Sequence, residues 1–129
     1  MNTREYGKQG EEIAAKFLSD KGLTILERNY TTPMGEIDII ARDKDNTLVF
    51  AEVKTAYGFA AGDPASWVNG KKQLKVGRVA SAYLTKQGFS DVSCRFDVLG
   101  VMMERGKEPD ITHYENAFML TQGPKFLWP

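Results

Sequence analysis

The segment GEIDIIARDKDNTLVFAEVK, residues 35–54, constrains the fold of this chain more strongly than any other stretch. Two apolar runs flank the polar turn DKDN, which is the pattern of a β-hairpin. Unlike an ordinary hairpin, its arms carry charged residues at the ends away from the turn. The chain is therefore expected to contain an antiparallel sheet with carboxylates built into two neighbouring strands.

The register of this hairpin predicts which charges meet. Side chains alternate across a strand, so every second residue shares a face. The predicted facing pairs are Ile40 with Phe50, Asp38 with Glu52, and Glu36 with Lys54. Because like charges opposite one another destabilise a sheet, the two facing carboxylates need a cation, which either Lys54 or a metal ion would supply.

The remaining elements follow from hydrophobic periodicity and breaker residues. Helical spacing predicts one helix over residues 4–21, ended by Gly22, and a second from about Ser66 to Lys86, ended by Gly88. Three further strands are predicted at residues 23–30, 94–103 and 110–120. The order helix, three strands, helix, two strands predicts an α/β fold, a mixed five-stranded sheet with a helix on each face.

Length and composition narrow the class of protein. The 129 residues, 42% of them hydrophobic, fit a single domain, predicted over residues 1–120 and followed by a tail at 121–129. Lysine plus arginine equals aspartate plus glutamate at 17 each, so only local clusters could attract a nucleic acid. One cysteine, no apolar run of about 18 residues and a charged N-terminus predict a reducing, cytoplasmic location without a membrane.

A third carboxylate is predicted to face inward from the first helix. Glu11 shares the helix face of Ala14 and Leu18. A carboxylate that points at a sheet is costly unless it is paired or binds a cation, so Glu11 could join Asp38 and Glu52; Arg28 on the first strand is its competing partner. Mg²⁺ takes oxygen ligands and is commonly held by one or two carboxylates plus waters and phosphate oxygens, a number that this site offers.

These residues resemble a known nuclease pattern. Asp38, then Glu52-Val53-Lys54, with Glu11 upstream, resembles the PD-(D/E)xK motif, in particular its archaeal Holliday junction resolvase branch. The stretches GKQGEEIAAKFLSDKG, ILERNY, GEIDIIARD, VFAEVKT and RFDVLGV are similar to the YraN-like bacterial family of predicted endonucleases. The resemblance implies a restriction-endonuclease-like three-layer core and a Mg²⁺- or Mn²⁺-dependent endonuclease acting on DNA, including branched or junction DNA, with a homodimer as one arrangement.

The resemblance also implies a role for each residue. Asp38 and Glu52 would bind the metal with the backbone carbonyl of Val53, Lys54 would position the attacking water and stabilise developing charge, and Glu11 would be an outer or second-metal ligand. Two departures stand out: Ile37 replaces the proline of the motif's name, and TAYG after Lys54 lacks the basic residue expected there.

Basic and aromatic residues supply candidate contacts to a nucleic acid. A stripe at helical spacing on the second helix suits a phosphodiester backbone, and a solvated helix face is the equally weighted alternative. The predicted contacts are Lys71, Lys72, Lys75, Arg78 and Arg28. Tyr57, Phe59 and Trp67 could stack on unpaired bases, but such aromatics are more often core or loop anchors.

Three functions therefore compete. The first is a metal-dependent endonuclease, and the second is a catalytically inactive nucleic-acid-binding module of the same fold. The third is a protein-interaction domain that uses the apolar tail and the glycine-rich loop AYGFAAGDPAS, residues 56–66. An ordinary cluster of salt bridges at a strand end is the alternative to a metal site.

Overall fold

The computed structural model describes residues 3–57 and 70–118, which form two helices and five strands. The elements are α1 (Thr3–Asp20), β1 (Thr24–Thr32), β2 (Gly35–Arg42), β3 (Leu48–Tyr57), α2 (Gly70–Gln87), β4 (Cys94–Met103) and β5 (Asp110–Phe118). This order confirms the predicted α-β-β-β-α-β-β arrangement. The predicted start of the second helix near Ser66 and the tail at 121–129 lie outside the described residues.

The five strands form one mixed sheet in the order β1-β2-β3-β4-β5. β1, β2 and β3 are antiparallel neighbours, β3 and β4 are parallel, and β5 returns antiparallel to β4. Parallel neighbours cannot be joined by a tight turn, so the chain crosses from β3 to β4 through α2. The crossover brings β4 alongside the strand that carries Glu52 and Lys54.

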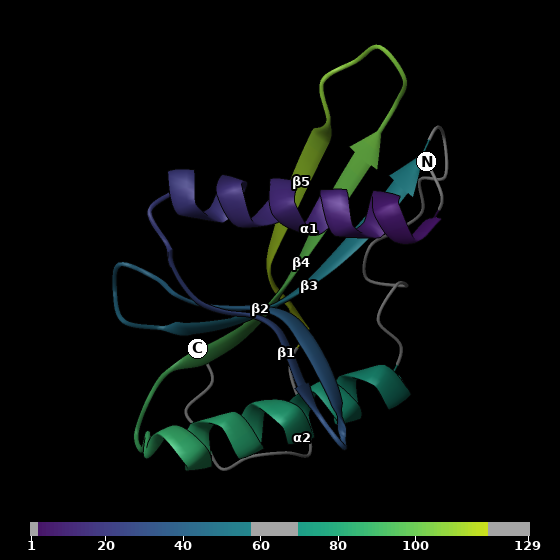
Figure 1. The fold of residues 1–129 in the computed structure, drawn as a ribbon. Helices are drawn as coiled ribbons and strands as arrows, with labels where there is room; N and C mark the ends of the chain where they lie inside the picture. The colour runs from purple at the N-terminus through teal and green to yellow at the C-terminus, as the bar shows by residue number, and fades with distance from the viewer. Residues whose placement is uncertain (1–2, 58–69, 119–129) are drawn as a thin grey trace.

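A helix covers each face of the sheet, and each helix encloses its own apolar core (Figure 1). On one face, Ala14 and Leu18 of α1 pack in the same cluster as Val49. On the other face, Val79 of α2 packs in the cluster of Phe50. Val49 and Phe50 are adjacent in β3 and enter opposite cores, so this strand is buried from both sides and the predicted three-layer architecture is confirmed.

Both helices end at the predicted glycines. After α1, Gly22 takes a φ of 104° and the Leu23 N–H donates to the Leu18 carbonyl at 3.0 Å. After α2, Gly88 takes a φ of 74° and the Phe89 N–H donates to the Leu84 carbonyl at 3.0 Å. A bond that spans five residues around a left-handed glycine is the Schellman ending, which satisfies carbonyls that the helix leaves unpaired.

Gly10, within α1, sets how closely this helix approaches the sheet. A Cβ on Gly10 would lie 2.0 Å from the Oγ1 of Thr55 in β3, so only a glycine permits the present spacing. Gly7, one turn earlier, has open space around its Cα. The close contact at Gly10 fixes the position of its neighbour Glu11 relative to β3.

None of the helices within residues 3–57 and 70–118 is both long and apolar enough to cross a bilayer.

Candidate metal and phosphate site

The candidate site lies where β2 and β3 stop pairing. Ile40 pairs with Phe50 as predicted, and the last pair of the ladder is Ile39 with Ala51. At the next position the Val53 N–H donates to the Oδ2 of Asp38 at 2.8 Å, so a side chain takes the place of the backbone acceptor. The ladder therefore opens at Asp38, and its carboxylate lies in the opening.

The predicted alternation of β2 is wrong beyond this point. Ile37 packs in the α2 core together with Ile40, although strict alternation would put these two residues on opposite faces. Glu36 pairs with Thr31 of β1, and no pairing of β2 with β3 reaches it, so the predicted Glu36–Lys54 pair does not form. β2 still pairs with β1 in regular register here, but its pairing with β3 has ended.

Burial and mutual repulsion dominate the electrostatics of the two carboxylates. Asp38 is 7% exposed, and the Glu52 side chain is 15% exposed. Burial raises the pKa of Asp38 to about 6; the Val53 N–H acts in the opposite direction, and the charges of Glu11 and Glu36 add to the increase. Burial and then the charge of Asp38 also raise the pKa of Glu52. Burial, and then the neighbouring carboxylates, therefore favour the neutral forms of both side chains.

The lysine that compensates Glu52 is Lys72 of α2, not Lys54. The Nζ of Lys72 forms an ion pair with the Oε1 of Glu52. Lys54 is exposed and forms no ion pair with any residue of the described ranges. Lys54, one of the two alternatives for the compensating cation, is therefore not the group that pairs with Glu52 in this structure. The sequence contains no signal for the Lys72 contact, since it depends on how α2 is aimed after the crossover.

Glu11 contributes charge to the site without joining the pair. It raises the pKa of Asp38 through space. Within the described residues, however, no three histidine, cysteine, aspartate or glutamate side chains lie close enough together to hold a metal ion by themselves. Arg28 does not compete for Glu11: it donates to Glu12 at 2.8 Å. Glu11 thus lies beyond a two-carboxylate centre.

The donor set fits a hard divalent cation. Asp38 and Glu52 provide carboxylate oxygens, both with raised pKa values, so a cation between them would relieve the repulsion. In an extended strand the N–H and C=O of one residue point to the same side, so the Val53 carbonyl faces the opening into which its N–H donates. Two carboxylates and one carbonyl leave the remaining positions of an octahedral Mg²⁺ to water and phosphate oxygens.

The basic stripe predicted on the second helix is present. Lys71, Lys75 and Arg78 are exposed on α2, and Lys72 extends from the same helix to Glu52. Positive charge therefore borders the carboxylates on the α2 side. The fifth predicted contact, Arg28, is held by its ion pair with Glu12 on the α1 side of the sheet.

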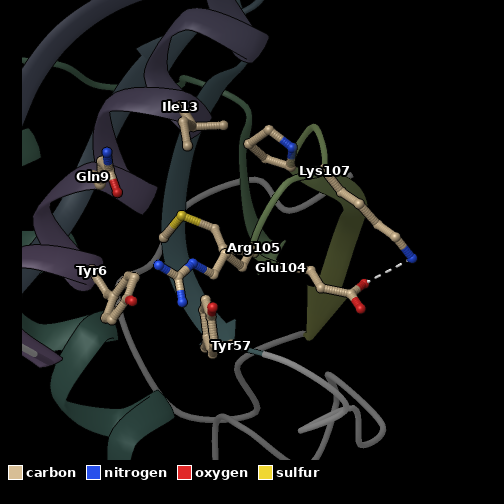
Figure 2. Close-up of a pocket in the computed structure, with 9 residues that line it drawn as sticks. Tyr6, Gln9, Ile13, Tyr57, Glu104, Arg105 and Lys107 are labelled. Atoms are coloured by element: carbon tan, nitrogen blue, oxygen red, sulfur yellow. Dashed lines mark ion pairs between the residues drawn. The ribbon is translucent and has the colours of Figure 1, made fainter. Parts of the chain in front are cut away.

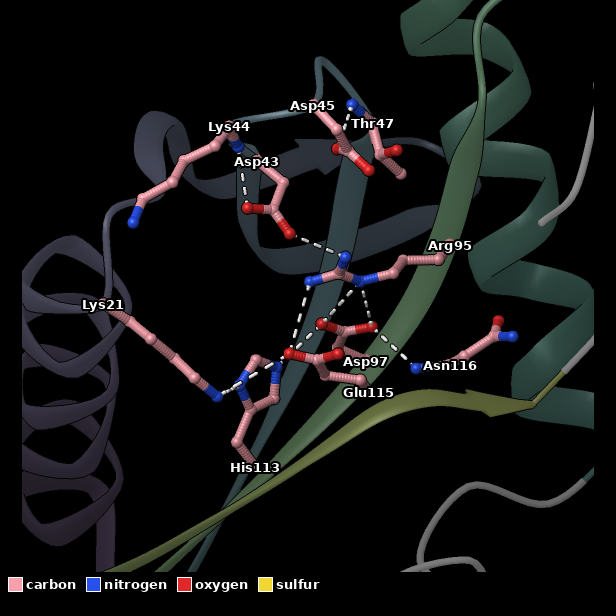
Figure 3. Close-up of polar contacts among 10 residues, drawn as sticks. All are labelled: Lys21, Asp43, Lys44, Asp45, Thr47, Arg95, Asp97, His113, Glu115 and Asn116. Carbon is pink, nitrogen blue, oxygen red and sulfur yellow. Dashed lines mark hydrogen bonds and ion pairs between the residues drawn. The ribbon is translucent and has the colours of Figure 1, made fainter.

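A separate polar network crosses β4 and β5 (Figure 3). Asp97 is fully buried and accepts hydrogen bonds from the Nε of Arg95 at 3.1 Å and from the Asn116 N–H at 2.9 Å. Lys21 donates to the Nδ1 of His113 at 2.8 Å, so the proton of the ring lies on Nε2, which donates to Asp97 at 2.7 Å. His113 is thus a hydrogen-bonded structural residue.

This network is anchored to the β2–β3 turn rather than to the carboxylate pair. The Nη1 of Arg95 donates to Asp43 at 2.7 Å. Although burial acts against it, the charge of Asp97 raises the pKa of Arg95. Arg95 and Asp97 hold β4 to the β2–β3 turn and to β5.

Comparison with known proteins places the chain among proteins of similar length. The model of a family described as "Uncharacterised protein family UPF0102" matches residues 10–101. A UPF0102 protein of Desulforamulus reducens is 45% identical over 119 residues, covering 91% of this chain and 98% of that protein. A UPF0102 protein of Dictyoglomus thermophilum is 40% identical over 119 residues, covering 92% and 100%.

One solved structure is distantly similar, that of Pyrococcus furiosus SfsA in complex with Ca²⁺. Its sequence identity is 16% and the TM-score is 0.37, over 88% of this chain and 64% of that chain.

Proposed function

The chain belongs to the uncharacterised protein family UPF0102, the family expected from its motifs, and we propose that it is a metal-dependent endonuclease that hydrolyses phosphodiester bonds in DNA. The observation that carries this proposal is the pair Asp38 and Glu52, two buried carboxylates with raised pKa values at the opening of the β2–β3 ladder. Strongly perturbed pKa values of this kind cluster at functional sites.

Each residue of the candidate site would have its own role in hydrolysis. Asp38, Glu52 and the Val53 carbonyl would hold the ion, Mg²⁺ or Mn²⁺. The bound ion would supply positive charge to the phosphodiester and increase the acidity of an attacking water. Lys54, exposed at the end of β3 and without an ion pair in the described ranges, would orient that water and stabilise charge that develops on the phosphate.

Lys72 and the exposed α2 stripe would bind the substrate. In the free protein Lys72 neutralises Glu52, and once a cation takes over that role its ammonium is free to contact a phosphate oxygen. Lys71, Lys75 and Arg78 would follow the backbone of the strand away from the site. Glu11 would act as an outer ligand or bind a second ion.

The test is calorimetric titration with Mg²⁺ and Mn²⁺, with cleavage of branched and linear DNA assayed in the same samples. Asp38→Asn keeps an acceptor for the Val53 N–H but removes the charge, and Asp110→Asn, at an exposed position in β5, is the matched control. We expect binding and cleavage in the native chain and in the control, and neither in Asp38→Asn. Cleavage that survives in Asp38→Asn would contradict the assignment.

A catalytically inactive nucleic-acid-binding module is the second candidate, and the exposed basic residues of α2 favour it equally. It predicts DNA binding that depends on Lys71, Lys75 and Arg78 while the native chain binds neither Mg²⁺ nor Mn²⁺, even with DNA present.

A further inference from the structure

A cavity of about 520 Å³ lies on the flank of α1 that faces the β4–β5 turn (Figure 2). It is bounded by the first half of α1, the last residue of β3 and the turn after β4. The residues that give it its chemistry are Tyr6, Gln9, Ile13, Tyr57, Met103 and Arg105. None of them belongs to the candidate metal site.

The cavity is tied to the candidate site through two elements. Tyr6 is on the same helix as Glu11, and Tyr57 is three residues beyond Lys54 on β3. At roughly 3.3 Å per residue, Tyr57 lies about 10 Å along the strand from Lys54. Because side chains alternate along β3, Lys54 lies on the α2 face and Tyr57 on the α1 face. A nucleic acid at Lys54 would therefore reach the cavity by crossing the edge of β3 that β2 leaves unpaired beyond Ala51.

Two tyrosines give the cavity an aromatic wall. The ring centroids of Tyr6 and Tyr57 are 5.1 Å apart and the planes are inclined by 37°. Tyr57 is 47% exposed, which leaves much of its surface open although Tyr6 contacts it. Ile13 and Met103 add apolar surface beside the rings. An exposed tyrosine supported by a second ring is a platform on which a planar group can stack.

Arg105 supplies the charge. It is exposed and forms no ion pair with any residue in the described ranges 3–57 and 70–118, whereas Lys107 in the same turn pairs with Glu104 at 3.3 Å. A guanidinium can bind a phosphate through two parallel hydrogen bonds. Gln9 offers both a donor and an acceptor, which suits the edge of a base.

We propose that this cavity binds an unpaired nucleotide of the strand that is cut, with the base on Tyr57 and its phosphate on Arg105. The inference rests on the proposed function, because it assumes that a strand runs past Lys54. A paired base cannot reach an aromatic platform, so the cavity makes the protein selective for DNA with a single-stranded segment next to the cut, a flap or a splayed branch.

The test measures binding without hydrolysis. Asp38→Asn protein in EDTA is titrated with a flap DNA that carries 2-aminopurine in the unpaired segment, and with a continuous duplex of equal length. We expect quenching of the probe, and Tyr57→Ala in the same background should weaken flap binding roughly tenfold, the size expected for one stacked base, while duplex binding stays within about twofold. Tyr57→Phe should retain the stacking.

Two further variants keep the result interpretable. Arg105→Gln, in an exposed turn, should weaken flap binding without affecting the fold, and Tyr114→Ala, which removes an exposed tyrosine of β5 outside the cavity, should change nothing. The inference is overturned if Tyr57→Ala and Arg105→Gln leave flap binding intact, or weaken flap and duplex equally.

The two proposals fail in different ways. Flap binding that depends on Tyr57, in a native chain that cleaves no DNA with Mg²⁺ or Mn²⁺, supports the cavity and overturns the endonuclease. Cleavage that depends on Asp38 but is equal for flap and duplex, and indifferent to Tyr57→Ala, supports the endonuclease and overturns the cavity.

Discussion

At the scale of single residues, Asp38 has two roles that conflict. Its Oδ2 accepts the Val53 N–H and so replaces a missing ladder bond, which favours the charged form. Burial and the neighbouring charges of Glu11 and Glu36 favour the neutral form and prevail, with a pKa of about 6. A structural role alone would be met by asparagine, and the proposed metal ion would give this buried charge a partner.

Replacing Asp38 with asparagine should therefore stabilise the protein, but only above acid pH. The pKa rises from 3.8 to about 6 on folding, so between these values the folded state binds a proton that the unfolded state has released. Stability contributed by this group falls as pH rises through that window, and the full penalty applies above it. We expect Asp38→Asn to raise the free energy of unfolding by roughly 1–3 kcal/mol at pH 7.5 and by almost nothing at pH 4.

Urea unfolding at the two pH values, without divalent ions, measures this difference. The exposed Asp110→Asn serves as the control and should be neutral at both. A variant that is less stable than the native chain at pH 7.5 would show that the Asp38 charge is satisfied inside the protein.

Lys72 should compete with the metal ion for Glu52. Their ion pair is partly exposed, so it is worth about 1 kcal/mol at most. We expect Lys72→Met to bind Mn²⁺ up to about fivefold more tightly in the absence of DNA, because the competing ammonium is gone, and to cleave DNA more slowly, because a phosphate contact is lost. Lys75→Met on the same helix is the control for general charge. Calorimetry that shows weaker Mn²⁺ binding in Lys72→Met would contradict the competition.

At the scale of elements, the depth at which α1 packs decides how Glu11 faces the site. Gly10 and Gly7 lie in the same helix, but only Gly10 contacts Thr55. We expect Gly10→Ala to destabilise the protein by roughly 1–3 kcal/mol, since its Cβ meets the threonine side chain. Gly7→Ala should stabilise it by about 0.5–1 kcal/mol through helix propensity alone. Thermal unfolding of both variants, and of Gly10→Ala with Thr55→Ala, checks this prediction. Equal effects of Gly10→Ala and Gly7→Ala would exclude a close contact.

The Arg95 network should hold β4, β5 and the β2–β3 turn together. Asp97 is fully buried and its charge pairs with the largely buried Arg95, so Asp97→Asn should cost about 3–5 kcal/mol. Glu115→Gln, at a 53% exposed side chain, should cost less than about 1 kcal/mol. Urea denaturation gives both values, and a mild effect of Asp97→Asn would show that the network contributes little to the cohesion of the sheet.

At the scale of the whole molecule, the regular parts of the fold were predictable and the irregular parts were not. Periodicity locates the strands, and it pairs Ile40 with Phe50 because both arms of the hairpin follow a period of two up to that point. The pattern fails at Asp38, where the pairing of β2 with β3 has ended. No local sequence rule predicts that the Asp38 side chain will accept the hydrogen bond of the Val53 N–H.

The contacts that the sequence failed to predict are mainly those between charged groups far apart in the chain. Lys72 contacts Glu52 because of the direction in which α2 packs on the sheet after the crossover. The spacing of residues within a helix does not predict that direction. The Lys21–His113 and His113–Asp97 bonds join three elements in the same way. The positions of Asp38 and Glu52 in the strands identified them as site residues, but the sequence did not identify Lys72 as the partner of Glu52.

The most direct measurement is an amide NMR spectrum of the full chain titrated with Mn²⁺, whose unpaired electrons broaden only nearby signals. An ion held by Asp38, Glu52 and the Val53 carbonyl should first broaden the amides of these three residues, with Glu11 next, and excess Mg²⁺ should restore them. Broadening that begins at Asp43 and Asp45 in the β2–β3 turn, or that is spread evenly over exposed carboxylates, would contradict a metal site at the end of the ladder.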